Sequence, residues 1–167
     1  KIDGLSGFTL LGIPLSGKQS ISIEDGMRLL PAFRDKSFPA SFNLNIAAIN
    51  PNDSAGNKPG PTATLRNFAW TLLIDSVQTI SGDIAQPVSI PGTGQTVIIP
   101  LKMDLDLYKF FADKGYEGLV NLALALGGAS PQLRRVQLQA QPTIDTQFGP
   151  MTYPGKITIV DSEFRSQ

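Results

Sequence analysis

The chain has 167 residues, a length that suits one domain whose core needs neither a disulfide nor a metal. Its 14 basic and 14 acidic residues cancel and are scattered, so no basic face for nucleic-acid binding is predicted. The absence of cysteine and histidine excludes a thiol nucleophile, a disulfide framework, a His-dependent triad and ordinary zinc sites. No apolar run approaches the roughly 20 residues that a membrane-spanning helix needs.

The first part of the chain predicts one or two short strands followed by a short helix. Phe8 to Ile13 is extended and apolar, and glycines punctuate it. Residues 22–33 follow a helical pattern in which Ser22 and Asp25 form an N-cap signal. Pro31 is expected to bound the connector that leads to the next strand.

The segment that follows alternates apolar and polar residues and then stops at Asn-Pro-Asn. Its apolar positions share one face, as expected for a half-buried strand: Phe42, Leu44, Ile46 and Ala48. Pro51 has no N–H and pushes Asn50 out of the helical region. The side chains of Asn50 and Asn52 are expected to bond nearby backbone groups, which would end the strand there.

The middle of the chain predicts further strands, separated by turn signals about every ten residues. The predicted segments are a loop at 53–61, strands at 68–74 and 77–80 joined by an Asp75-Ser76 turn, a short strand at 88–90, a loop at 91–94 and a strand at 97–105. Gly82 is expected to mark a bulge or bend. Pro100 favours an edge position for its strand, because proline cannot donate to a ladder.

A helical period follows over 106–126, with glycines that predict two helices or one broken helix. Gly127-Gly128 is a helix-stop signal. Val136 to Gln141 alternates most clearly, 148–155 is rich in turn residues, and 156–160 is a last strand. The pattern predicts an all-β fold with one helical crossover, arranged as an antiparallel β-sandwich.

This ordered set of motifs resembles the late-embryogenesis-abundant type 2 family, also called the water-stress-and-hypersensitivity domain, and most of all its bacterial envelope members. The resemblance covers about residues 40–162, within a single domain spanning 1–167, and the motifs that carry it include Asn50, Pro51, Asn52, Gly82, Gly149, Pro154 and Gly155. It implies an immunoglobulin- or fibronectin III-like sandwich with no catalytic residues, no cofactor and no metal. It also implies export to the bacterial cell envelope, as a lipoprotein and a monomer, with an envelope protein or glycan as the partner class.

Two short motifs suggest chemistry, and each also has a structural interpretation. Gly12 to Gln19 approaches a phosphate-binding loop, but Gln19 replaces the Mg²⁺-binding hydroxyl, and a hairpin turn is the alternative. Asp104 and Asp106 would place two carboxylates on one strand face, as glycoside cleavage requires. Because they lie where a strand gives way to a helix, capping is the favoured interpretation.

Two further groups of residues have weaker functional patterns. The loop oxygens of Asn50, Asn52, Asp53, Ser54 and Asn57 include a single carboxylate, whereas calcium usually takes several, and Asn52 also begins a glycosylation sequon. The aromatic residues Phe68, Trp70, Phe110 and Phe111 would line a ligand groove or, as the sequence favours, pack in the core.

Three functions are therefore weighed from the sequence. The first is a non-enzymatic structural or stress-protective envelope domain, held by an N-terminal lipid that would need a cysteine upstream of Lys1. The second is a binding module that engages an envelope protein or glycan through a sandwich edge or loop end; an exposed apolar patch would favour it. The third is a hydrolase that uses Asp104 and Asp106.

Overall fold

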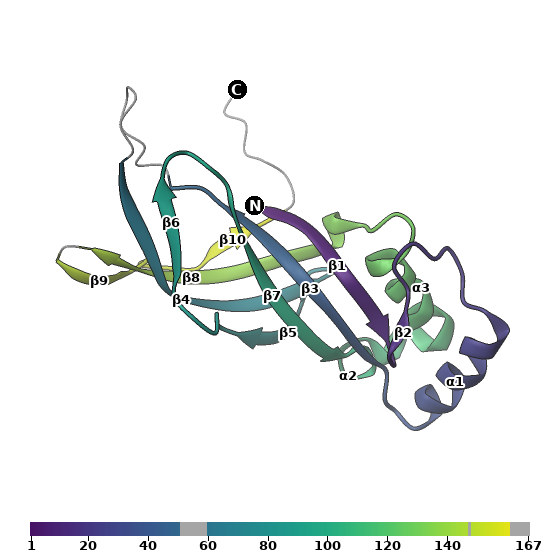
Figure 1. Cartoon of the computed structure of the whole chain (residues 1–167). Helices are drawn as coiled ribbons and strands as arrows, with labels where there is room; N and C mark the ends of the chain where they lie inside the picture. The colour runs from purple at the N-terminus through teal and green to yellow at the C-terminus, as the bar shows by residue number, and fades with distance from the viewer. Residues whose placement is uncertain (51–59, 147, 161–167) are drawn as a thin grey trace. The chain divides into compact units, whose positions relative to one another are not determined.

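The computed structural model of the chain describes residues 1–50, 60–146 and 148–160 (Figure 1). The strands are β1 (Ile2–Leu10), β2 (Ile13–Pro14), β3 (Pro39–Ala48), β4 (Gly60–Ile74), β5 (Val77–Gly82), β6 (Val88–Gly92), β7 (Val97–Asp106), β8 (Val136–Thr146), β9 (Gly149–Thr152) and β10 (Ile157–Ile159). The helices are α1 (Ile23–Arg34), α2 (Leu107–Phe111) and α3 (Gly115–Gly127), with short 3-10 turns η1 (Ala112–Lys114) and η2 (Leu133–Arg135).

The strands form two hydrogen-bonded sheets. One has the order β2-β1-β3-β7, and the other has the order β10-β8-β4-β5, with β6 paired to β4 and β9 paired to β8. Strands of the second sheet pair antiparallel throughout. The fold is therefore mostly antiparallel β, as predicted, and it carries helices in two separate stretches of the chain.

The chain divides into two compact units. Unit 1 comprises Lys1–Asp3, Asn45–Ile99 and Val136–Gln167, and unit 2 comprises Gly4–Leu44 and Pro100–Arg135. Unit 1 contains the whole six-stranded sheet, and unit 2 contains the three α-helices. The prediction of a single domain over 1–167 stays a prediction.

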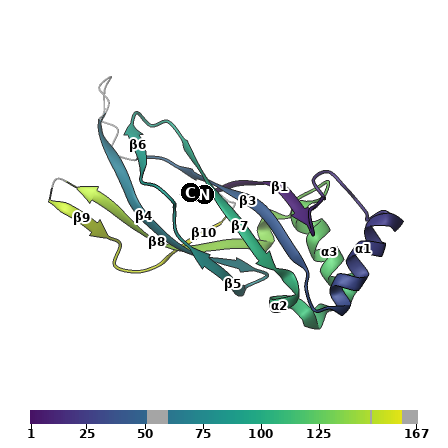
Figure 2. The same cartoon turned by 60° about the horizontal axis from the view of Figure 1, so that its bottom comes forward.

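The core of unit 1 rests on the long pairing of β4 with β8, which lie side by side in Figures 1 and 2. The alternating residues of β8 are fully covered, as predicted: Val136, Leu138 and Ala140 are 1%, 0% and 0% exposed. The Asp75-Ser76 turn is also confirmed. Both residues adopt positive φ angles of 50° and 65°, as expected for a two-residue turn between antiparallel strands.

Asn50 ties three segments of unit 1 together at the end of β3. Its side chain is 2% exposed, and its Nδ2 donates to the carbonyl oxygen of Pro61 at 2.8 Å and to that of Ile90 at 3.1 Å. Both of these acceptors lie far along the chain, in β4 and β6, so the two bonds are long-range. The prediction that Asn50 bonds nearby backbone stays a prediction. Pro51 and Asn52 lie outside the described residues.

Gly82 is required by a close contact with an aromatic ring. It lies opposite Trp70 in the β4–β5 ladder, and a Cβ at this position would come within 2.6 Å of the Trp70 Cζ2 atom. The predicted irregularity does occur in this ladder, but it lies between Ser81 and Gln78 on the β5 side. Glycine at position 82 therefore makes room for the indole.

In unit 2, the N-terminus of α1 forms as predicted, since the Ser22 Oγ accepts a hydrogen bond from the Asp25 N–H at 3.1 Å. The helix predicted over 22–33 is confirmed as Ile23–Arg34, but the prediction that Pro31 bounds the connector was wrong, because Pro31 lies inside α1. Proline leaves the carbonyl four residues earlier without a helical donor. That residue is Met27, whose side chain is 72% exposed, so water has access to this face of the helix.

The helical segment after β7 is broken in the way that its glycines predict. Gly115, with φ of 74°, separates α2 and η1 from α3. Gly127 ends α3 and lies against an aromatic ring, since an added Cβ would come within 2.2 Å of the Phe8 Cγ.

β7 occupies the edge of its sheet, as the proline at position 100 predicts. Among the described residues, no helix is long and apolar enough to cross a membrane.

Candidate functional site

The end of the β8–β9 hairpin carries three exposed large apolar side chains, including the two most exposed ones among the described residues of unit 1. Phe148 is 88% exposed, Met151 is 61% exposed and Tyr153 is 50% exposed. Figures 1 and 2 show β9 beside the far end of β8. Because large apolar side chains normally avoid water, this group is the first candidate for a binding surface.

The turn of this hairpin is fixed by its own residues. The Thr146 Oγ1 donates to the carbonyl oxygen of Gly149 at 2.7 Å and accepts from the Phe148 N–H at 3.1 Å. Gly149 has a φ of 102°, a region that side chains with a Cβ rarely adopt. Thr146 and Gly149 therefore hold the backbone from which Phe148 projects.

The turn-rich stretch 148–155 contains a short strand that the sequence did not predict, since Gly149–Thr152 is strand β9. Met151 lies opposite Ile144, and the hydroxyls of Thr143 and Thr152 are hydrogen-bonded at 2.9 Å. These cross-strand pairs stabilise a strand whose own sequence carries strong turn signals.

The outer edge of β9 is a poor template for a further strand. Among the described strands, β9 pairs with β8 alone, and it is only four residues long. Pro150 has no backbone N–H, so one donor is missing from this short edge. Contacts at this end must therefore come mainly from side chains.

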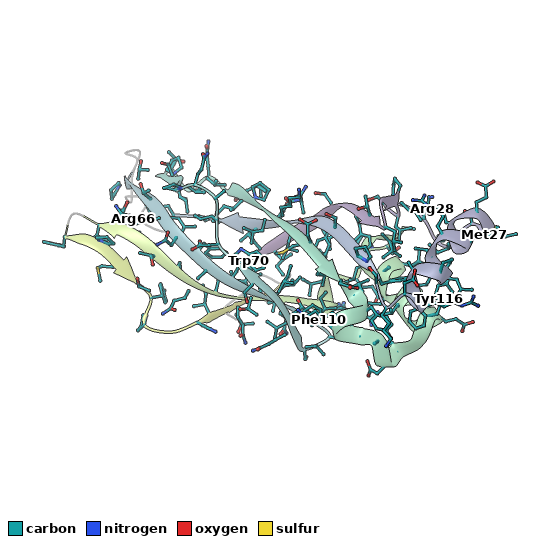
Figure 3. The ribbon with its side chains drawn as sticks, turned by 90° about the horizontal axis from the view of Figure 1, so that it is seen from below. Met27, Arg28, Arg66, Trp70, Phe110 and Tyr116 are labelled. Atoms are coloured by element: carbon teal, nitrogen blue, oxygen red, sulfur yellow. The ribbon has the colours of Figure 1, made fainter. Side chains whose placement is uncertain are left out.

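The one carboxylate of the hairpin is paired with a cation. The Arg66 Nε lies 2.7 Å from the Asp145 Oδ1, and the two side chains are 51% and 32% exposed. Asp145 is the only acidic residue in 136–160, where Lys156 is the only basic one. Figure 3 shows Arg66 on β4. This end of unit 1 therefore carries no uncompensated negative charge among these residues.

The predicted carboxylate pair lies in unit 2, at a shallow depression of about 430 Å³. Its lining includes Thr9, Leu11, Gly12, Pro39, Ala40, Ser41, Asp104, Leu105 and Asp106. The Asp106 Oδ1 accepts from the Phe38 N–H at 2.8 Å and from the Tyr108 N–H at 3.0 Å, which confirms the capping interpretation for Asp106. Asp104 is exposed on β7 and accepts a hydrogen bond from the Ser41 hydroxyl.

A second exposed apolar pair lies on α1. Ile23 and Met27, one helical turn apart, are 86% and 72% exposed. The inner side of the helix is packed, since Leu29 is fully buried and the Phe33 ring lies 5.8 Å from that of Tyr116. Figure 3 shows Met27 projecting from α1 on the side away from Tyr116.

The phosphate-loop motif forms a hairpin turn, as its structural interpretation predicts. Leu11 and Gly12, both with positive φ, connect β1 to β2, where Leu10 lies opposite Ile13. The next helix begins only at Ile23. The segment therefore offers no helix N-terminus directly after the glycine-rich turn, which is where a phosphate would bind.

The other sequence candidates separate into core residues and residues beyond the described ranges. Phe68, Trp70 and Phe111 are 5%, 7% and 2% exposed, which confirms their core interpretation, and Phe110 is half-buried. Of the loop-oxygen group, positions 52, 53, 54 and 57 lie outside the described residues. The described part of the chain contains no group of three or more acidic, histidine or cysteine residues that could hold a metal ion.

Of the remaining motif residues, Pro154 and Gly155 lie in the exposed connection between β9 and β10. The sequence analysis did not single out Phe148, Met151 or Tyr153 as functional. The sequence feature that could have indicated their exposure is the occurrence of large apolar residues among glycine and proline turn signals, where no periodic pattern predicts burial.

Comparisons with known proteins add distant structural likenesses only. No protein-family model matches the chain, and no curated protein matches it. A solved structure of a protein from Archaeoglobus fulgidus is 7% identical, with 96% of this chain and 100% of that chain covered and a TM-score of 0.32. The X-ray structure of Northeast Structural Genomics Consortium target SoR45 is 9% identical, with 98% and 92% covered and a TM-score of 0.39.

Proposed function

We propose that this chain is a non-enzymatic binding module that engages its partner through the end of the β8–β9 hairpin. The observation that carries the proposal is the exposure of Phe148, Met151 and Tyr153 on one hairpin. Three large apolar side chains in water favour association, because their burial releases free energy roughly in proportion to the area covered.

The loop end, rather than the strand edge, is the proposed contact. Pro150 removes a donor from the outer edge of β9, which weakens strand addition as a binding mode there. Phe148, by contrast, is 88% exposed and projects from a turn whose backbone is hydrogen-bonded. Side-chain insertion into an apolar environment is the recognition mode that these groups support.

The non-enzymatic part of the proposal is supported by the bonds of the predicted carboxylates. Asp106 accepts two backbone hydrogen bonds that join the start of α2 to the residue before β3. Asp104 accepts from the Ser41 hydroxyl. These bonds give both carboxylates a structural role, and a hydrolase acting through them would have to break or share those bonds.

The proposed setting is the bacterial cell envelope, with the chain as a monomeric lipoprotein of the late-embryogenesis-abundant type 2 kind. The finer fold proposal that accompanies it is an immunoglobulin- or fibronectin III-like sandwich, which an experimental structure would test. A stress-protective role, predicted from the same resemblance, stays a prediction. A drying and rehydration assay with a labile reporter enzyme, against an equal mass of an inert globular protein, would test it.

Site-specific photocrosslinking tests the proposed function. A photoreactive amino acid placed at position 148 in the full chain should give covalent adducts, with lipid or with protein, in intact cells that produce the protein. The same group at position 27, on the exposed face of α1, is the matched control because both native side chains are more than 70% exposed. Equal adduct yields at the two positions, or none at either, would overturn the proposal.

A further inference from the structure

We propose that the end of the β8–β9 hairpin inserts into the surface of a lipid bilayer, an inference that rests on the proposed function and names its partner class. Phe148 enters the region below the headgroups, Met151 follows at the boundary, and Tyr153 lies at the level of the headgroups. Three features of unit 1 carry this inference: the spacing of the exposed side chains, the missing backbone donor and the local charge.

The spacing of the three side chains suits the depth of the bilayer interface. A strand rises about 3.3 Å per residue, so Met151 lies roughly 7 Å from Gly149 along β9, and Tyr153, one residue past the end of β9, lies at most roughly 13 Å from Gly149. Segments that lie in the interface bury their apolar groups about 5–10 Å deep. Phe148 and Met151 fall within that depth, and tyrosine is a residue type enriched at the boundary with water.

The backbone of β9 also suits a partner that forms no hydrogen bonds. Pro150 offers no N–H to a partner strand, and Pro150, Met151 and Thr152 are all exposed, so both faces of the short strand are open. A lipid surface surrounds an inserted loop and can cover apolar groups on both faces. A flat protein interface would cover one face and leave the other in water.

The charges near the hairpin are compatible with anionic headgroups. The charge of Asp145 is compensated by Arg66 at 2.7 Å, and Lys156, which directly precedes β10, is the one basic residue in 136–160. This part of the chain therefore presents no uncompensated carboxylate among these residues to the negative surface potential of an anionic leaflet. Near the exposed pair on α1, Glu24 and Asp25 lie in the first turn of the helix, and Asp25 is paired with Lys18 at 3.5 Å.

Vesicle flotation is the first test of this inference. The purified full chain should float with vesicles of phosphatidylcholine and phosphatidylglycerol and float less with phosphatidylcholine alone. Phe148→Ser should lower the partition coefficient about tenfold, since removing a large apolar side chain from a buried environment is worth at least 1.4 kcal/mol. Met27→Ser, which changes a comparably exposed side chain on α1, should leave the partition coefficient unchanged.

A fluorescence measurement tests the insertion itself. Trp70 is the one tryptophan of the chain and is only 7% exposed, so its emission should be insensitive to brominated lipids. The Phe148→Trp variant adds an indole at the hairpin turn, and vesicles with brominated acyl chains should quench the added emission. Quenching restricted to this variant would support insertion, and the wild-type protein serves as its control.

The outcomes separate this inference from the proposed function. If the wild-type chain fails to float with either vesicle type, or if Phe148→Ser floats as well as the wild type, lipid insertion is wrong. Photocrosslinking at position 148 then decides the rest: an adduct with a protein would keep the hairpin as a binding site with another class of partner. Absence of both vesicle binding and adducts would overturn both proposals.

Discussion

Removal of the side chain of Asn50, two residues after β3, should lower the free energy of unfolding much more than removal of an exposed asparagine side chain within β3. Asn50 is 2% exposed, and its Nδ2 donates two hydrogen bonds, at 2.8 Å and 3.1 Å, to backbone carbonyls of β4 and β6. Asn50→Ala would remove both bonds and leave these two carbonyl oxygens short of a donor. We therefore expect the free energy of unfolding to fall.

The magnitude follows from the two bonds and their burial. Each intramolecular hydrogen bond contributes about 0.5–1.5 kcal/mol net, and leaving a buried acceptor unpaired costs about 1–3 kcal/mol. Since some of that cost is relieved by local relaxation, a loss of about 3 kcal/mol is expected. For a chain of this size, each kcal/mol shifts the melting temperature by about 2–4 °C, so the shift should be about 6–12 °C.

Urea denaturation followed by tryptophan emission would measure this loss, because Trp70 lies in the same unit as Asn50. Asn43→Ala is the matched control, since Asn43 is an exposed residue of β3 and should change stability by less than about 0.5 kcal/mol. If the two variants unfold within about 0.5 kcal/mol of each other, the argument for Asn50 as a buried tie is wrong.

An isosteric substitution sharpens the same test. Asn50→Asp keeps the size of the side chain. It replaces the amide Nδ2, which donates to the carbonyl oxygens of Pro61 and Ile90, with a carboxyl oxygen, which accepts hydrogen bonds when ionised. Burial and the two carbonyl oxygens should raise the pKa of the introduced carboxyl group in the folded state. The variant should therefore lose stability as the pH rises above the ordinary range of aspartate, whereas the wild-type chain should show no such loss from position 50.

Two further substitutions test close contacts in the two units. Gly82→Ala should lower the free energy of unfolding by about 1–3 kcal/mol, because the new Cβ would lie 2.6 Å from the Trp70 ring. Gly155→Ala is the control and should be nearly neutral, because position 155 has open space around it. Equal melting temperatures of the two variants would contradict the contact between Gly82 and Trp70. Asp106→Ala should cost about 1–3 kcal/mol by removing the acceptor of two backbone N–H groups, while the exposed Asp113→Ala should cost far less in the same thermal melt.

Periodic elements were predictable from the sequence because their physical cause is local. The alternation of Val136, Leu138 and Ala140 reports which face of β8 is covered, and burial follows the alternation. Ser22 caps α1, and Asp106 caps α2, because an acceptor side chain at those positions meets free N–H groups whatever surrounds it. For the same reason, the helix break at Gly115 could be expected from the glycine alone.

Local patterns fall short where distant segments decide the outcome. The two Nδ2 bonds of Asn50 reach β4 and β6, which no local pattern indicates. Pro31 lies inside α1 because the packing of Leu29 and Phe33 holds the helix together despite a missing donor. Tertiary contacts outweighed the local preference at Pro31.

The same division explains why the sequence did not indicate the hairpin end as a candidate site. The pair Asp104 and Asp106 was visible because acidic residues two apart form a motif, and the structure gives both carboxylates structural hydrogen bonds. The exposure of Phe148 is not a motif at all, since a phenylalanine in a sequence is ordinarily assigned to the core. It becomes a candidate only when the hairpin is seen to leave that ring 88% exposed, and an apolar ring in water with a fixed backbone is a reason to look for the surface that covers it.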